Sequence, residues 1–372
     1  MGIRVKDSLT LSPYLLWFLL HGAQVGIAML SFQRYIITGA EQDSWASLLL
    51  VGISLHFIIW IMFFVLKNAD SGDIISLHQQ LFGKWVGKCL TLGFYGYILL
   101  FVTTEIRLYV EVLHVWVFPN IRLWVFSLMI LIICIYLVSG GLRVVAGVCF
   151  FCIFIPSLLL LTLYFPLKSA HWTNFLPIFN HQFKDYAQSA YHSLTLFTGV
   201  EFLLVLYPFI KNNEKSQKWA HIGVVHTTLL YLFMIFVSFS YFNIQQLEHT
   251  IWPTLILSKI IQFPFLERFD YLYVYNWFLI IVARCCVPLW AGTRILKKTF
   301  GLKARPSLWI TSTLVFLCLI PLKGQKIIEK LDFLLTMTGG ILLYGYIPFL
   351  FLLILIINFN KKKNMVKVRG NQ

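Results

Sequence analysis

The chain has 372 residues, of which 59% are hydrophobic and only 12% are charged. Soluble globular proteins carry about 25% charged residues, so this composition excludes a water-soluble protein and indicates one embedded in a bilayer. The net charge of +15 would suggest a nucleic-acid partner in a soluble chain, but no basic run is interleaved with stacking aromatic residues, so no nucleic-acid binding is expected.

Long apolar runs predict about ten transmembrane α-helices within a single membrane domain that covers residues 1–372. A bilayer offers backbone groups no partner, so such runs form helices or closed barrels, and no alternation of period two favours a barrel. The expected spans are Thr10–Ile37, Asp43–Leu66, Trp85–Val115, Ile121–Val138, Leu142–Tyr164, Tyr186–Ile210, Trp219–Asn243, Tyr271–Leu296, Ser307–Leu322 and Phe333–Phe359. The first run is too long for a signal peptide and lacks a small-residue cleavage pattern, so no cleavage is expected.

Two short segments of mixed polarity are expected to lie in the plane of the membrane rather than across it. They are Ser71–Lys84 and Trp252–Gln262. An in-plane helix buries its apolar face at the boundary between headgroups and acyl chains. A partly ordered loop is the alternative for both.

Basic residues are distributed unevenly between the two sides of the predicted membrane. With the N-terminus inside, 19 of the 30 Lys and Arg residues lie in cytoplasmic segments, nine lie outside, and Arg107 and Arg284 lie within spans. Loops that stay in the cytoplasm carry an excess of Lys and Arg. Both termini, including the basic tail at residues 360–372, are therefore predicted to be cytoplasmic.

The first and sixth spans are each interrupted by polar residues and glycine. The interruptions read His21-Gly22-Ala23-Gln24-Val25-Gly26 and Thr195-Leu196-Phe197-Thr198-Gly199-Val200-Glu201. They occupy equivalent positions if residues 10–165 and 186–359 are two five-helix repeats. Paired interruptions are typical of an inverted-repeat transporter fold with its site at the midplane. Close helix packing at glycine is the alternative.

Unwound helix segments create a candidate ligand site. Their free backbone groups are tolerated at membrane depth only where they line a cavity or meet a ligand. The half-helix after Gly26 presents open N–H donors that suit a carboxylate, and carbonyl ends suit an ammonium, so a small zwitterion such as an amino acid satisfies both. The candidate ligand-binding residues are Gly22, Ala23, Gln24, Gly26, Phe101, Glu105, Thr198, Gly199 and Glu201.

Charged residues inside predicted spans require partners, because a charge in hydrocarbon is costly. Arg107 and Glu111 are four residues apart and share a helix face, which predicts a structural ion pair. Arg284 is expected to pair with Glu105 or Glu201. In folds of this type a sodium site commonly uses the first and eighth helices. A fixed guanidinium there would exclude Na⁺, so sodium coupling is not expected.

No cofactor, metal site or catalytic motif is expected. The seven cysteines lie in or beside apolar runs, where free Cys behaves as a small hydrophobic residue. Cys149 and Cys152 have redox spacing but lack a βαβ context, so packing is the preferred interpretation. The absence of metal-ligand spacing, a nucleophile elbow and a phosphate-binding glycine loop argues against an enzyme.

Several short motifs, taken in order, resemble the B subunits of bacterial spore germinant receptors, a branch of the amino acid–polyamine–organocation transporter superfamily. The similarity covers essentially the whole chain. Its motifs are the Gly22–Gly26 break, Gln42-Asp43-Ser44-Trp45, Asp73-Ile74-Ile75 with Gly83-Lys84, Asn174-Phe175-Leu176-Pro177, Phe197-Thr198-Gly199-Val200-Glu201 with Pro208, and Glu267-Arg268-Phe269-Asp270. The segment Ser31-Phe32-Gln33-Arg34 departs from the pattern, because many relatives have a proline there.

The resemblance implies an all-α, LeuT-like membrane protein of the spore inner membrane. It further implies partnership with an A subunit and a lipoprotein C subunit, and a role in sensing nutrients such as amino acids or sugars to trigger germination. The rival interpretation is an amino acid transporter, with or without protons, in which Glu201 or Glu105 carries the proton.

Overall fold

The computed structural model describes residues 9–120, 122–264 and 267–370, except for the side chains of Gln325 and residues 361–370. Within these ranges the chain is helical, apart from loops and one isolated β-bridge. In chain order the α-helices are α1 (Leu15–Gln24), α2 (Phe32–Ile36), α3 (Ser44–Lys67), α4 (Ile74–Trp116), α5 (Leu123–Ser139), α6 (Leu142–Leu160), α7 (Tyr164–Leu167), α8 (Phe183–Ser193), α9 (Leu203–Leu206), α10 (Gln217–Tyr241), α11 (Ile244–His249), α12 (Pro253–Lys259), α13 (Phe269–Phe300), α14 (Ala304–Leu319), α15 (Gln325–Gly340) and α16 (Ile347–Gly370).

Six helical segments of the described chain are long and apolar enough to cross a membrane. They are Glu41–Lys67, Ile74–Trp116, Leu142–Leu167, Asn213–Tyr241, Phe269–Phe300 and Lys326–Asn360. A pair of helices, Phe183–Phe197 and Val200–Phe209, is bent by 48° and would form a seventh span. The interrupted first span and the shorter apolar helices Leu123–Ser139 and Ala304–Leu319 account for the rest of the ten expected spans.

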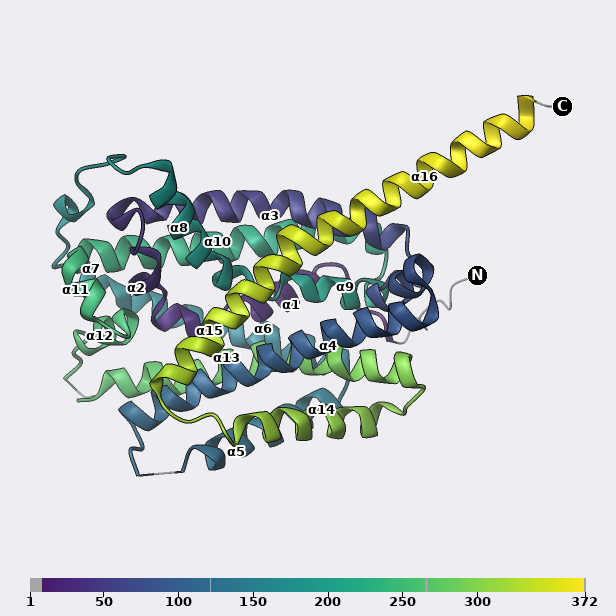
Figure 1. Cartoon of the computed structure of the whole chain (residues 1–372). Helices are drawn as coiled ribbons and strands as arrows, with labels where there is room; N and C mark the ends of the chain where they lie inside the picture. Colours follow the sequence, from purple (N-terminus) through teal and green to yellow (C-terminus); the bar gives the residue numbers. More distant parts are fainter. Residues whose placement is uncertain (1–8, 121, 265–266, 371–372) are drawn as a thin grey trace.

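Several spans begin or end at residues other than the predicted ones. Helix α13 is 32 residues long and exceeds the expected Tyr271–Leu296 at both ends. The last span contains a π-helical turn, η10 (Ile341–Tyr346), and α16 then continues through Gly370, so the basic tail prolongs the helix. Figure 1 shows α16 crossing the bundle and projecting beyond its other helices. The expected start of the fourth span, Ile121, lies outside the described residues.

Helix α13 forms the centre of the bundle. It is the most buried of the six long segments and packs against α4, α6 and α14. On another side of the molecule α3 and α10 run next to each other (Figure 1). Helix α1 lies between these groups and contacts α10, α6 and α13. The interrupted first span is thus surrounded by helices, which keeps its freed backbone groups away from lipid.

The first expected in-plane segment is helical and is fixed to the end of α13. Helix α4 begins at Ile74 and bends at Gly83, whose φ of 76° and ψ of 177° separate the short leading helix from the span. The Asp73 carboxylate caps this helix by accepting from the Ser76 amide at 2.9 Å. Lys298 Nζ donates to both Asp73 oxygens, at 2.7 and 2.6 Å. The second segment contains α12, preceded by α11.

A backbone bridge connects the chain just before α1 to the chain at the end of η8 (Tyr207–Phe209). The Leu11 amide donates to the Phe209 carbonyl at 2.8 Å, and the Lys211 amide donates to the Leu11 carbonyl at 2.8 Å. This pairing, between Leu11 and Ile210, runs parallel. It thus joins the beginning of the first broken span to the end of the sixth.

Candidate functional site

Both predicted interruptions are present as breaks in the helix. Val25 (φ −83°, ψ 123°) and Gly26 (φ −150°, ψ −153°) separate α1 from η2 (Ile27–Leu30). Thr198 (φ −60°, ψ 140°) and Gly199 (φ 117°, ψ −25°) separate η6 (Leu194–Phe197) from η7 (Val200–Phe202). The two breaks touch, because a Cβ built on Gly199 would overlap the Ala23 carbonyl oxygen. The positive φ at Gly199 also disfavours any side chain.

Arg284 of α13 binds the carbonyl groups that the breaks release. Its side chain is fully buried, at 0% exposure. One guanidinium nitrogen, Nη1, donates to the carbonyl oxygens of Ala23, at 2.8 Å, and of Gln24. It also reaches the Thr198 carbonyl at 3.4 Å, while Nη2 donates to Thr198 Oγ1 at 3.1 Å. A single guanidinium therefore bridges both broken spans.

Glu105 of α4 completes this arrangement. Its Oε1 lies 2.7 Å from Arg284 Nε, and its own exposure is 1%. Its Oε2 accepts from the Ile27 amide at 3.3 Å, at the start of the half-helix after the first break. Phe101, one turn earlier on α4, faces the Arg284 guanidinium at 4.7 Å. Of the two partners predicted for Arg284, the structure thus brings Glu105 within ion-pair distance.

Glu201 binds the second break instead. Its two carboxylate oxygens accept from the Gly199 amide at 2.9 and 2.8 Å. The Tyr97 hydroxyl donates to Oε1 at 2.6 Å. Glu201 is completely buried. It anchors a backbone N–H group that would otherwise lack a partner at this depth.

The chain's own side chains therefore occupy the positions expected for a zwitterionic ligand. The carboxylate of Glu105 meets the N–H end of the half-helix, where a ligand carboxylate was expected. The guanidinium of Arg284 meets the carbonyl ends, where a ligand ammonium was expected. In this conformation the partial charges of the freed backbone groups at the breaks are therefore neutralised by charged side chains of the protein itself.

The remaining candidate residues lie around this centre or apart from it. Gln24 Nε2 donates to the Phe197 carbonyl at 3.3 Å, and its Oε1 accepts from Thr227 Oγ1 at 2.9 Å. Gly22 packs against Cys149, one turn away from Gly26. Arg107 Nη1 contacts Glu111 at 2.8 Å, and Arg107 Nε donates to the Leu322 carbonyl at 2.9 Å. That pair belongs to a different part of α4 and does not touch the breaks.

Sequence reasoning missed three residues of the site. Tyr97 holds Glu201, Trp277 Nε1 donates to the Gly26 carbonyl at 3.2 Å, and Thr227 binds Gln24. A spacing signal was available for Tyr97, since it lies four and eight residues before Phe101 and Glu105 and shares their helix face. Trp277 similarly precedes Arg284 by seven residues. Thr227 carries no comparable signal.

A pocket of mixed polarity, with about 750 Å³ of empty space including its open mouth, adjoins the two breaks. Ile27 and Ala28, just after the first break, and Thr195 and Leu196, just before the second, line it. It also contains the acidic residues Glu111, Glu329 and Asp332. Among the described residues, no group of three or more His, Cys, Asp or Glu side chains is arranged to hold a metal ion.

Comparisons with known proteins relate most of the chain to one family. The profile of the family described as "Spore germination protein" matches residues 10–328. Spore germination protein GerQB of Bacillus cereus is 39% identical over 342 residues, which cover 92% of this chain and 95% of the relative. Spore germination protein A2 of Bacillus subtilis (strain 168) is 24% identical over 330 residues, covering 87% and 90%.

Solved structures with a similar fold are transporters. The nucleobase-cation-symport-1 family transporter Mhp1, in a closed conformation with bromovinylhydantoin bound, matches with a TM-score of 0.68, 10% identity and coverage of 92% of this chain and 79% of that one. MhsT in complex with L-phenylalanine matches with a TM-score of 0.59, 14% identity and coverage of 89% and 87%. At these identities the likeness shows the fold alone, and it confirms the predicted all-α transporter fold of about ten helices with the first and sixth broken.

Proposed function

Because the chain belongs to the spore germination protein family, we propose that it is the membrane-embedded B subunit of a nutrient germinant receptor. It is a multi-pass membrane protein, and the proposal places it in the spore inner membrane with both termini in the cytoplasm. It acts there with an A subunit and a lipoprotein C subunit. Its ligand is a small nutrient, an amino acid in the first instance, and its role is binding rather than catalysis.

The observation that supports this proposal is the internal charge arrangement at the two breaks. An amino acid carries a carboxylate and an ammonium, the same two charges that Glu105 and Arg284 place there. A nutrient that binds between the broken spans competes with Glu105 for the Ile27 amide and with Arg284 for the carbonyl ends of Ala23 and Gln24. Binding therefore favours a second arrangement of the breaks, and differential affinity for the two arrangements shifts their populations. Partner subunits read that shift.

The same geometry supports a sensor that does not use sodium. A guanidinium stays charged at any physiological pH, so the carbonyl groups that it binds are not free to coordinate Na⁺. A secondary amino acid transporter, with or without proton coupling, is the second candidate. Glu201 favours it, because this completely buried carboxylate has no cation within ion-pair distance among the described residues. Buried carboxylates of this kind mark proton relays in transporters.

Germination of spores that lack the gene tests the receptor proposal. Optical density loss and dipicolinate release are measured against a panel of amino acids and sugars. Deletion should abolish the response to one nutrient class, and the wild-type gene should restore it. Glu201→Gln at equal abundance should not restore it, whereas Glu248→Ala, at an exposed glutamate of α11, should. Unchanged germination combined with impaired amino acid uptake by growing cells would contradict the receptor and favour the transporter.

Flux separates the two candidates directly. The purified protein in proteoliposomes should bind the nutrient identified above without accumulating it. Accumulation that depends on a proton gradient and is lost in Glu201→Gln would instead establish transport.

A further inference from the structure

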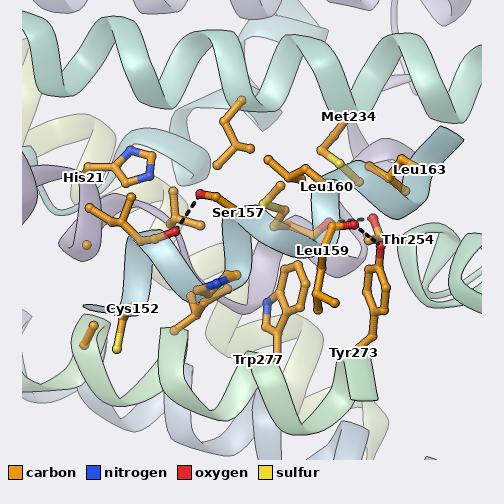
Figure 2. A pocket seen from close by; sticks show the side chains of 18 residues that line it. His21, Cys152, Ser157, Leu159, Leu160, Leu163, Met234, Thr254, Tyr273 and Trp277 are labelled. Carbon is orange, nitrogen blue, oxygen red and sulfur yellow. Dashed lines mark hydrogen bonds between the residues drawn. The ribbon is translucent and has the colours of Figure 1, made fainter. Parts of the chain in front are cut away.

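An apolar cavity with about 570 Å³ of empty space, its open mouth included, lies beside the first break. It is bounded by α1, α6, α10 and α13 and by η2. Figure 2 shows Met234 of α10 on one side, Trp277 and Tyr273 of α13 on the opposite side, and Leu159 and Leu160 of α6 between them. Gly22 and Trp277 border both this space and the breaks, but the charged groups at the breaks, Glu105, Arg284 and Glu201, do not line it.

In the described part of the chain, the wall of the cavity carries no carboxylate, ammonium or guanidinium group, and the His21 imidazole on it is paired through Nδ1 with Thr227 Oγ1 at 2.8 Å. None of its described lining residues is an Asp, Glu, Lys or Arg. Its hydroxyl groups are already bonded: Ser157 Oγ donates to the Ile153 carbonyl at 2.6 Å, Thr254 Oγ1 to the Met29 carbonyl at 2.8 Å, and Tyr273 Oη to the Leu159 carbonyl at 2.9 Å. A charged molecule would lose its hydration there without compensation, whereas an apolar molecule gains by leaving its solvent. The cavity therefore selects uncharged, apolar ligands.

The cavity opens toward lipid between α6 and α10. Most of its lining residues are buried, and the half-buried ones are Pro156, Ser157, Leu159, Leu160 and Leu230. The first four lie on α6 and the last on α10. The outer side of α6 is a surface of exposed apolar residues that includes Phe154, Ile155 and Leu158. A hydrophobic exposed face on a membrane helix meets acyl chains, so the route into the cavity starts in the bilayer.

We propose that this cavity is a binding site for an uncharged, largely apolar molecule that enters from the bilayer. The occupant contacts Val25, in the break itself, and Met29 of η2. It also contacts Trp277, whose indole N–H holds the Gly26 carbonyl. A molecule in this position stabilises the first break in the arrangement seen here and so opposes its rearrangement.

Fluorescence quenching by bromobenzene tests the proposal in the full-length protein reconstituted in lipid nanodiscs. The bromine atom quenches an indole on contact, and Trp277 lines the cavity. The wild type should show a saturable component of quenching above the linear decrease caused by partition into lipid. Trp277→Phe should lose this component. Saturating bromobenzene should also raise the thermal unfolding midpoint of the wild type, because a ligand of the folded state stabilises it.

Two substitutions that fill the cavity provide the decisive comparison. Ile153→Phe from α6 and Ile280→Phe from α13 enlarge buried lining residues, of 8% and 6% exposure. Each should abolish the saturable component while Trp277 remains. Leu158→Phe is the matched control, because Leu158 is 65% exposed on the same helix as Ile153 and should leave the component intact. Purely linear quenching in the wild type, or saturable quenching that survives in a folded filling variant, would overturn the proposal.

Discussion

Gly26 leaves no room for a side chain at the first break. A Cβ there would overlap Arg284 Cδ and would also press on the Glu105 carboxylate. Both neighbours are buried and hold each other, so neither can move aside without breaking the ion pair. Interiors packed this closely transmit such a displacement rather than absorb it.

Gly26→Ala should therefore abolish nutrient-dependent germination and lower the thermal unfolding midpoint of the purified protein. Gly147→Ala is the matched control, because Gly147 lies within α6 and a Cβ there meets nothing within 4 Å. That control should germinate normally and leave the midpoint unchanged or slightly raised, since alanine favours a helix over glycine. Equal behaviour of the two variants would count against the tight contact at Gly26.

The Glu105–Arg284 pair should behave as a coupled unit. Arg284→Ala or Glu105→Ala leaves the other charge buried without its partner, which costs about 3–5 kcal/mol of folding free energy. Removing both should cost clearly less than the sum of the two single changes, because no orphan charge remains. Unfolding titrations of the four proteins in detergent measure the coupling. Simple additivity would show that the two side chains do not depend on each other.

At the scale of elements, the breaks were predictable, whereas the choice between the two predicted partners of Arg284 was not. Glycine beside polar residues within an apolar run is a local signal. It predicted interruptions at His21–Gly26 and Thr195–Glu201, within which the structure has the breaks at Val25–Gly26 and Thr198–Gly199. The choice of Glu105 over Glu201 for Arg284 depends on how α4 and α13 are rotated against each other. These helices are far apart in the chain, so no local pattern sets that rotation.

The short helix that leads into α4 should depend on Asp73 in two separable ways. Asp73→Asn retains a side-chain oxygen for the Ser76 amide but loses the ion pair with Lys298. Asp73→Ala loses both, and loss of an N-cap costs about 0.5–2 kcal/mol. Hydrogen exchange of residues 74–82 should therefore be faster in Asp73→Ala than in Asp73→Asn. Lys298→Met also removes the ion pair and keeps the cap, so its exchange rate should equal that of Asp73→Asn. Unequal rates in these two variants would show that Asp73→Asn changes more than the ion pair.

At the scale of the whole molecule, composition and the order of apolar runs predicted the fold, while several boundaries required the tertiary structure. Helix α14 ends at Leu319 rather than Leu322, and α16 continues past Phe359 through the basic tail. Helix ends are set by contacts with other elements, which hydropathy does not record. The division into repeats at residues 10–165 and 186–359, and the orientation in the membrane, stay predictions.

Labelling of single cysteines tests the orientation. In a cysteine-free background, Lys168→Cys and Lys215→Cys place thiols at exposed positions in segments predicted to lie outside and inside, respectively. A membrane-impermeant maleimide should label Lys168→Cys in intact cells and Lys215→Cys only after permeabilisation. The reason is that loops with an excess of Lys and Arg, such as the one that contains Lys215, stay in the cytoplasm. The reverse pattern would place both termini outside.

The bridge between Leu11 and Ile210 bears on how freely this sequence can change. Its two hydrogen bonds use amide and carbonyl groups alone, so they are the same whichever side chains occupy these positions. Two parts of the protein that are nearly two hundred residues apart in the chain are thus connected by backbone hydrogen bonds that most substitutions do not affect. Proline at position 11 or 211 is the exception, since it has no amide hydrogen to offer the carbonyl of Phe209 or of Leu11. Relatives whose residues differ at both positions can therefore keep the same connection between their broken spans. Differences in sequence at these two positions then give no information about how the broken spans move.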